Sequence, residues 1–201
     1  MTNVSKKTNI LVKSALLLTI GFILTYFELP VMPAFPWLKV DLSAVPVLLT
    51  GFAFGPIPAL GVEFFKNFLV FTIKGSSTGG VGQIANFAIV GTFVFVASLT
   101  FMRQRTKKSA IIGVILGTIA MIPVAVLINV YVLVPLLFPG GLEAELYRKY
   151  ITYGIPMFNL IKGSLLSVTG IFFYSKVSFL IDKESGFRSK KNSLRQKESR
   201  I

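Results

Sequence analysis

The chain alternates long apolar runs with short polar or basic segments. Six apolar runs predict six helices, at residues 9–27, 44–54, 56–73, 81–102, 109–138 and 151–181. A helix needs about 20 residues to cross the apolar core of a bilayer, so the run at 44–54 is too short to span upright. We expect that segment to be a half-span shielded by its neighbours. The pattern predicts an all-α membrane protein with six transmembrane helices, of which the second is short.

The composition agrees with a membrane protein and argues against several classes of enzyme. Hydrophobic residues make up 53% of the chain, and neither Cys nor His occurs. Without Cys there are no thiolate metal sites, and without His the commonest metal ligand and proton shuttle is missing. We therefore expect no metal site, no Ser-His-Asp hydrolase and no catalytic residue in this chain.

The net charge of +13 is distributed unevenly between the two ends of the predicted helices. This placement indicates membrane orientation rather than nucleic-acid binding, because loops on the cytoplasmic side carry the excess of Lys and Arg. One side carries Lys6, Lys7, Lys13, Arg103, Arg105, Lys107, Lys108 and the basic residues after 175, while the other carries Lys39, Lys74, Arg148 and Lys149 together with four acids.

Both termini are therefore predicted to be cytoplasmic. We divide the chain into a cytoplasmic N-terminus at 1–8, a six-helix membrane domain at 9–182 with an outer loop at 28–43, and a basic cytoplasmic tail at 183–201. The expected location is a bacterial cell membrane, with several crossings and membrane lipid as a partner.

Polar side chains interrupt four of the predicted helices. They are Glu63, Lys66 and Asn67 in "VEFFKNF", Gln83 and Asn86 in "GQIANF", Asn129 in the fifth helix, and Asn159 and Lys162 in "MFNLIKG". Polar groups inside a bundle usually point inward, so these side chains are candidates to meet in one place.

Two interpretations of these polar residues are open. In the structural one, Glu63 and Lys66 neutralise each other along their own helix, and the amides bond between helices. Lys162 fits that interpretation less well, because no acid lies one helical turn away. A central Lys costs about 2.5 to 3.5 kcal/mol on insertion scales, so we interpret Lys162 as a ligand contact.

Three stretches of the chain resemble a known transporter family. "DLSAVPVLLTGFAFGP", "EFFKNFLVFTIKGSSTGGVGQIANF" and "MFNLIKG" are similar to the riboflavin-binding S components (RibU type) of energy-coupling factor (ECF) vitamin transporters. The resemblance implies six helices, a flavin bound near the outer face as transported substrate, and no cofactor. It also implies a partner module of one transmembrane coupling protein and two ATPase subunits. The G-x-x-x-x-G-K-[ST] pattern is absent, so ATP would have to bind a partner.

The resemblance also implies roles for individual residues. Asn159, Lys162 and Asn129 would contact the flavin, and Lys66, Asn67, Gln83 and Asn86 would supply further polar contacts, with the ribityl hydroxyls among their targets. Leu42 and Val45 would cover the ring. Ala15 and Thr19, four residues apart on the first helix, would form the small-residue face that docks on the coupling protein.

Other functions remain open on the sequence alone. One is an S component for another vitamin or for flavin mononucleotide. A second is an intramembrane enzyme, against which the absence of His and of a "GxSxG" stretch argues. A third is a stand-alone proton-coupled carrier that uses Glu63 as its relay.

Overall fold

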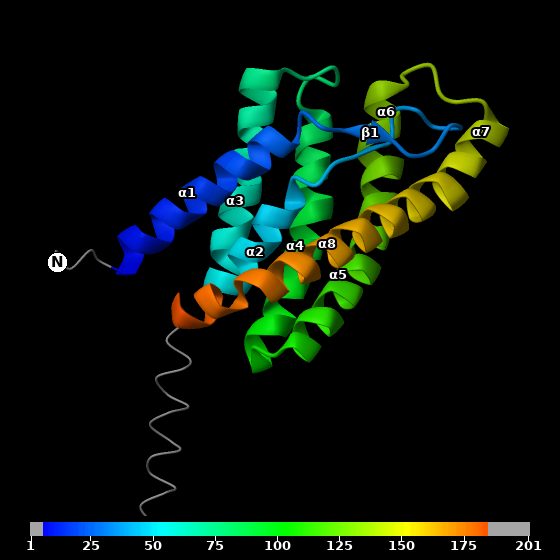
Figure 1. The fold of residues 1–201 in the computed structure, drawn as a ribbon. Coiled ribbons are helices and arrows are strands. Elements are labelled where there is room, and N and C mark those ends of the chain that lie inside the picture. The colour runs from blue at the N-terminus through cyan, green and yellow to red at the C-terminus, as the bar shows by residue number, and fades with distance from the viewer. Residues whose placement is uncertain (1–5, 185–201) are drawn as a thin grey trace, which may run out of the picture.

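All six apolar runs form helices in the computed structural model, which describes residues 6–184. The elements are α1 (Lys6–Leu24), β1 (Leu29–Pro30), β2 (Lys39–Val40), α2 (Ala44–Phe54), α3 (Pro56–Leu69) with the π-helical turn η1 (Val70–Lys74), α4 (Val81–Gln104), α5 (Lys107–Ile128) with η2 (Asn129–Leu133), α6 (Val134–Leu137), α7 (Ala144–Lys149) with η3 (Tyr150–Gly154), and α8 (Ile155–Glu184). Figure 1 shows their arrangement.

Five continuous helical stretches within the described residues are long and apolar enough to cross a membrane. They are Lys7–Leu24, Pro56–Lys74, Val81–Gln104, Lys107–Leu137 and Ala144–Ser175. The short helix at Ala44–Phe54 has the predicted bounds and is mostly buried among its neighbours. This shielding is expected, because the backbone N–H and C=O groups at the ends of a helix that is too short to span the bilayer must find hydrogen-bond partners inside the protein.

Two details differ from the predicted elements. The last membrane helix starts at 144 instead of 151, because α7 and η3 continue directly into α8. The loop at 28–43 contains a short antiparallel hairpin, in which Leu29 pairs with Val40 and Pro30 with Lys39. The predicted tail beyond residue 184 and the first five residues lie outside the described part of the chain.

The loop 28–43 lies at one end of the bundle, and the start of α1 and the end of α8 lie at the other. The loop follows the C-terminal end of α1 and lies beside α6 and α7, whereas α8 runs away from it toward Glu184 (Figure 1). The turn between α4 and α5 lies at the end away from the loop, and a capping box of Thr106 and Ser109 starts α5 there.

Two glycines bring the backbones of α4 and α5 into contact. A Cβ added at Gly113 would lie 2.6 Å from the carbonyl oxygen of Ala97, and one at Gly117 would lie 2.6 Å from that of Phe93. The two glycines are four residues apart, which is the spacing that lets membrane helices approach closely. These contacts make α4 and α5 a closely packed pair.

Large side chains fill the half of the bundle away from the loop. Phe52, Phe93 and Phe101 are completely buried, and the ring centroids of Phe52 and Phe101 are 4.6 Å apart. Tyr174 packs edge-on against both Phe52 and Phe101. This part of the protein is a packed core that contains side chains from α2, α4 and α8.

The contact between α4 and α5 predicts that Gly117→Ala destabilises the fold. The new methyl group would press on the Phe93 carbonyl, and overpacking of this kind costs about 1–3 kcal/mol. We expect a lower melting temperature in detergent. Gly61→Ala is the matched control, since no atom lies within 4 Å of a Cβ there. Equal melting temperatures for the two variants would contradict the close contact.

Candidate functional site

A cavity of about 590 Å³ lies at the end of the bundle that carries the loop 28–43. Its volume falls in the range of about 300–1,000 Å³ that is typical of small-molecule sites. The lining comes from the loop, the end of α3, the start of α4, η2, α6 and the start of α8. Segments that are far apart in the sequence therefore build one site.

A buried ion pair lies at the centre of the polar network beside this cavity. Lys66 Nζ is 2.7 Å from Glu63 Oε2, and both side chains are at most 1% exposed. Lys66 also donates a hydrogen bond to Ser43 Oγ at the start of α2, at 3.1 Å. The interpretation that Glu63 and Lys66 neutralise each other on one helix is confirmed. Lys66 nevertheless lines the cavity as well.

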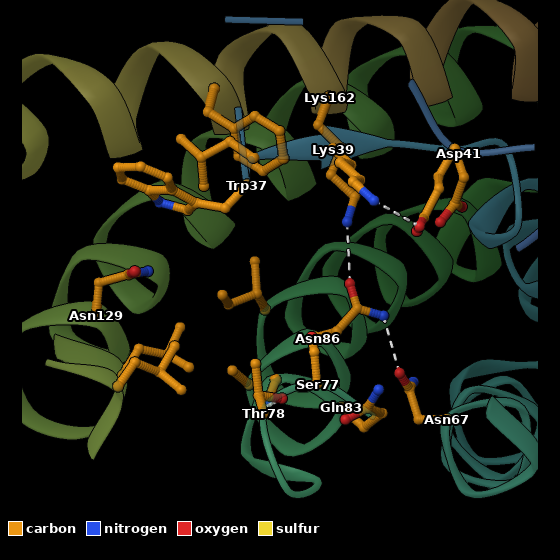
Figure 2. Close-up of a pocket in the computed structure, with 18 of the residues that line it drawn as sticks. Trp37, Lys39, Asp41, Asn67, Ser77, Thr78, Gln83, Asn86, Asn129 and Lys162 are labelled. Atoms are coloured by element: carbon orange, nitrogen blue, oxygen red, sulfur yellow. Dashed lines mark hydrogen bonds and ion pairs between the residues drawn. The ribbon is translucent and has the colours of Figure 1, made fainter. Parts of the chain in front are cut away.

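Two asparagines connect this ion pair to Lys162. Asn67 Nδ2 donates to Glu63 Oε1 at 2.7 Å, and Asn86 Nδ2 donates to Asn67 Oδ1 at 3.0 Å. Lys162 Nζ donates to Asn86 Oδ1 at 2.9 Å. Figure 2 shows the last two of these bonds as dashed lines. The network joins polar groups of α3, α4 and α8 that the sequence predicted to meet.

An acid from a distant loop compensates part of the charge of Lys162. Asp41 lies in the loop just before α2, near Lys162 in Figure 2, and its Oδ1 accepts a hydrogen bond from Ser43 N at 2.7 Å. Burial raises the pKa of Asp41, but the positive charges of Lys162 and Lys66 and the hydrogen bonds from Ser43 outweigh burial and hold that pKa below its ordinary value of 3.8. Asp41 is therefore a carboxylate at neutral pH.

Asn129 and Asn159 are buried on two different walls of the cavity. Asn129 donates to the carbonyl of Ala125 at 2.8 Å and accepts a hydrogen bond from the Tyr150 hydroxyl at 2.8 Å. Asn159 donates to the carbonyl of Ile155 at 2.9 Å. Figure 2 places Asn129 across the pocket from Asn67. Polar contacts for a ligand are thus available from opposite sides.

An aromatic cluster covers the other part of the cavity. The ring centroid of Trp37 lies 5.9 Å from that of Tyr150 and 6.1 Å from that of Phe138. Phe35 packs against Tyr150 with centroids 5.2 Å apart. A flat apolar ligand surface would find aromatic partners here.

Ion pairs connect the loop 28–43 to the end of α3 at the mouth of the cavity. Glu28 lies 3.0 Å from Lys39 Nζ and 3.3 Å from Lys74 Nζ. Partial burial raises the pKa of Glu28, but the two lysines outweigh this effect, and the pKa lies below its ordinary value of 4.5. The hydroxyl of Ser76 donates to Gln83 Oε1 at 2.8 Å on the same rim.

Most of the residues predicted to bind substrate line this one cavity, and two do not. The lining includes Asn159, Lys162, Asn129, Lys66, Asn67, Gln83 and Asn86. Val45 is instead buried in the hydrophobic core, and Leu42 packs against that core. The start of α2 turns these two side chains inward, so Trp37, Leu38 and Tyr150 take the place expected for them.

Several lining residues were not predicted from the sequence. Lys39 and Asp41 belong to the loop 28–43, which folds over the cavity, whereas Thr25 directly follows α1 and Lys74 ends η1. For Asp41 the signal in the sequence was Lys162, which has no acid one helical turn away. That signal could not be used without knowing that the loop and α8 meet.

Comparisons with known proteins identify the family to which the chain belongs. The family model for the substrate-specific component of ECF transporters matches residues 9–172. The chain belongs to this family.

Named relatives of this substrate-specific component are riboflavin transporters. The riboflavin transporter RibU of Staphylococcus aureus (strain TCH60) is 34% identical over 171 residues, which cover 84% of this chain and 89% of the relative. RibU of Streptococcus thermophilus is 32% identical, over 91% of this chain and 87% of the relative. The riboflavin transporter FmnP of Bacillus subtilis is 30% identical, over 89% and 96%.

A solved structure supports the fold of this substrate-specific component. The structure of the S component of a bacterial ECF transporter aligns with a TM-score of 0.75 at 32% identity. The alignment covers 87% of this chain and 98% of the solved one. The chain is thus a multi-pass protein of a bacterial membrane with the S-component fold and a transport function.

The lowered pKa of Asp41 predicts how this substrate-specific component responds to acid. A carboxyl group whose pKa is lower in the folded than in the unfolded state stabilises the fold fully above its ordinary pKa, here 3.8, and loses that contribution as the pH falls below it. We expect Asp41→Asn to lower the melting temperature in detergent at pH 7. The melting temperature of this variant should also fall less steeply with decreasing pH below pH ~4.

The exposed ion pair of Glu145 and Lys149 offers the control for this experiment. Exposed pairs contribute about 0–1 kcal/mol, so Glu145→Gln should leave the pH profile close to that of the unmodified protein. If Asp41→Asn and Glu145→Gln gave the same profile, the electrostatic role of Asp41 would be refuted.

Proposed function

We propose that the cavity binds riboflavin and that the chain delivers this vitamin to the cytoplasm as part of an ECF transporter. The observation that carries the proposal is the division of the cavity lining. Amides and two ammonium groups from α3, α4, η2 and α8, most of them buried, line one part of the cavity, and aromatic rings line another. The names of the relatives, all riboflavin transporters, support the same substrate.

The chemistry of riboflavin matches both parts of the lining. Its isoalloxazine ring is planar, with an apolar dimethylbenzene end and a pyrimidine end that carries carbonyls and an N–H. An Asn amide offers a donor and an acceptor together, and a Lys ammonium offers donors to carbonyl oxygens. We place the pyrimidine end against Asn159, Lys162 and Asn129, and the ribityl hydroxyls against Lys66, Asn67, Gln83 and Asn86.

The transport cycle follows from the orientation predicted by the basic residues. With both termini in the cytoplasm, the cavity under the loop 28–43 opens to the outside. This chain contains no Walker A pattern, so hydrolysis of ATP belongs to the partners: one transmembrane coupling protein and two ATPase subunits. They reorient the loaded subunit, and the vitamin is released inside.

The alternative of a proton-coupled carrier is less well supported. A relay carboxylate must exchange protons with water, but Glu63 is completely buried, does not line the cavity, and is bonded to Lys66 and Asn67. Its geometry is that of a fixed charge.

We expect Lys162→Ala and Asn159→Ala each to weaken riboflavin binding by about 10- to 100-fold, the effect of losing a buried hydrogen bond to a polar ligand. Titration of the detergent-solubilised variants against quenching of flavin fluorescence measures the affinity. Lys149→Ala is the control, because Lys149 is exposed and does not line the cavity.

Two results would count against the riboflavin proposal. Mass spectrometry of the molecule that copurifies with the unmodified protein should find riboflavin, and another vitamin in its place would assign a different substrate. Unchanged riboflavin affinity in both folded variants would remove Lys162 and Asn159 from the site.

The exposed face of α1 is the proposed docking surface for the coupling protein. Ala15 and Thr19 are both exposed, and the Thr19 hydroxyl donates to the carbonyl of Ala15 at 3.0 Å. The hydroxyl is thus satisfied within the helix, which leaves a small surface that another helix can approach closely.

A bulky residue at this surface should therefore block transport without affecting substrate binding. We expect Ala15→Leu to lower riboflavin uptake by cells that express the whole transporter, while the affinity of the purified subunit stays unchanged. Ile119→Phe, at an exposed apolar position of α5 away from α1, is the matched control. Normal uptake with Ala15→Leu would exclude this docking surface.

A further inference from the structure

The direction of the hydrogen bonds beside the cavity is fixed by ions at both ends of the network. A carboxylate only accepts hydrogen bonds, and an ammonium group only donates them. Asn86 lies between the two kinds of ion: its Nδ2 is 3.3 Å from Glu63 Oε1, and its Oδ1 accepts from Lys162 Nζ at 2.9 Å. Its amide can therefore hold only one of its two orientations.

Asn67 is held by the same carboxylate oxygen. Its Nδ2 donates to Glu63 Oε1 at 2.7 Å and to the carbonyl of Glu63 at 2.8 Å, which leaves its Oδ1 to accept from Asn86 Nδ2. One carboxylate thus orients two amides, and through the second amide it provides the acceptor for Lys162.

Glu63 itself does not touch the cavity. It is completely buried and is absent from the lining, whereas Lys66, Asn67, Asn86 and Lys162 all belong to the lining. Glu63 can therefore be connected to a ligand by hydrogen bonds only through these side chains.

We infer that Glu63 is the positioning residue that sets the hydrogen-bond direction of the site, so that Lys162 presents N–H donors to the carbonyl oxygens of the ligand. The ammonium group carries three N–H donors, and Asn86 accepts one of them. This inference rests on the proposed function and deepens it: the selected ligand class is a flat heteroaromatic ring with carbonyl oxygens at the edge that faces Lys162.

A neutral amide at position 63 would disturb this arrangement without changing its size. If the oxygen of the introduced amide keeps the hydrogen bond from Lys66, the NH₂ group of the same amide faces the NH₂ groups of Asn67 and Asn86. These amides must then rotate, and a rotated Asn86 turns its own donors toward Lys162. Glu63→Gln therefore displaces the ammonium group of Lys162 from its position.

A comparison of Glu63→Gln in two backgrounds and a series of ligand analogues test this inference. We expect Glu63→Gln to weaken riboflavin binding by about 10- to 100-fold, the usual result of leaving buried polar groups mispaired. In a Lys162→Met background the same substitution should cause a smaller loss of riboflavin affinity, because the effects of substitutions at interacting residues are not additive. Equal fold-losses in the two backgrounds would overturn the inference.

The ligand analogues are 2-thio- and 4-thioriboflavin, in which one carbonyl oxygen is replaced by sulfur, a weak acceptor. The unmodified protein should prefer riboflavin over at least one of them, and Glu63→Gln should lose that preference. A role in stability alone would leave the preference intact, and that result would also overturn the inference. Glu145→Gln, at an exposed acid, is the matched control.

A companion variant covers the case in which Glu63→Gln alone does not fold. Removal of one partner leaves the charge of Lys66 buried and unpaired, whereas replacement of both charges is often tolerated. Glu63→Gln combined with Lys66→Met removes the pair together and still releases Asn67 and Asn86. Absence of riboflavin binding by the unmodified protein would overturn the proposed function itself, whereas intact binding with additive losses overturns only the role of Glu63.

Discussion

The structure around the cavity depends on one buried ion pair. Glu63 and Lys66 lie one helical turn apart on α3, are almost completely removed from solvent, and are 2.7 Å from each other. Charges in such a place are tolerated only when they are paired and their remaining hydrogen-bonding capacity is used. Ser43, Asn67 and Asn86 supply these bonds, so the pair draws the start of α2 and the start of α4 toward α3. The walls of the site are positioned by the need to satisfy these two ions.

The same requirement connects the loop 28–43 to the helices. Lys162 on α8 is buried, and the opposite charges that act on it come from Asp41 in the loop and Glu63 on α3. Glu28 connects the hairpin to Lys74 at the end of α3 by a further ion pair. The loop is therefore held over the cavity by charge as well as by the packing of Phe35 and Trp37 on Tyr150.

The helices could be predicted from the sequence because their signal is local. Runs of apolar residues gave the bounds of α2 correctly and those of the other helices to within a few residues, apart from the early start of the last one at 144.

The polar residues of the site were also predictable, since a charged or amide side chain in an apolar helix stands out against its neighbours. The contacts between them were not, because the helices that carry them are far apart in the sequence: Asn86, which accepts a hydrogen bond from Lys162, lies 76 residues earlier in the chain. Leu42 and Val45 show the same limit: their apolar character indicated burial, but the direction in which α2 enters the bundle decided that they lie in the core and not at the cavity.

The packed core below the cavity determines the route by which a ligand can leave. Phe52, Phe93 and Phe101 fill the bundle on the side away from the loop, and Tyr174 closes against two of them. The site is consequently a dead end and not a segment of a channel. A molecule that enters past the hairpin has to exit through the same opening, so its passage to the other side of the membrane requires that opening to change the compartment it faces.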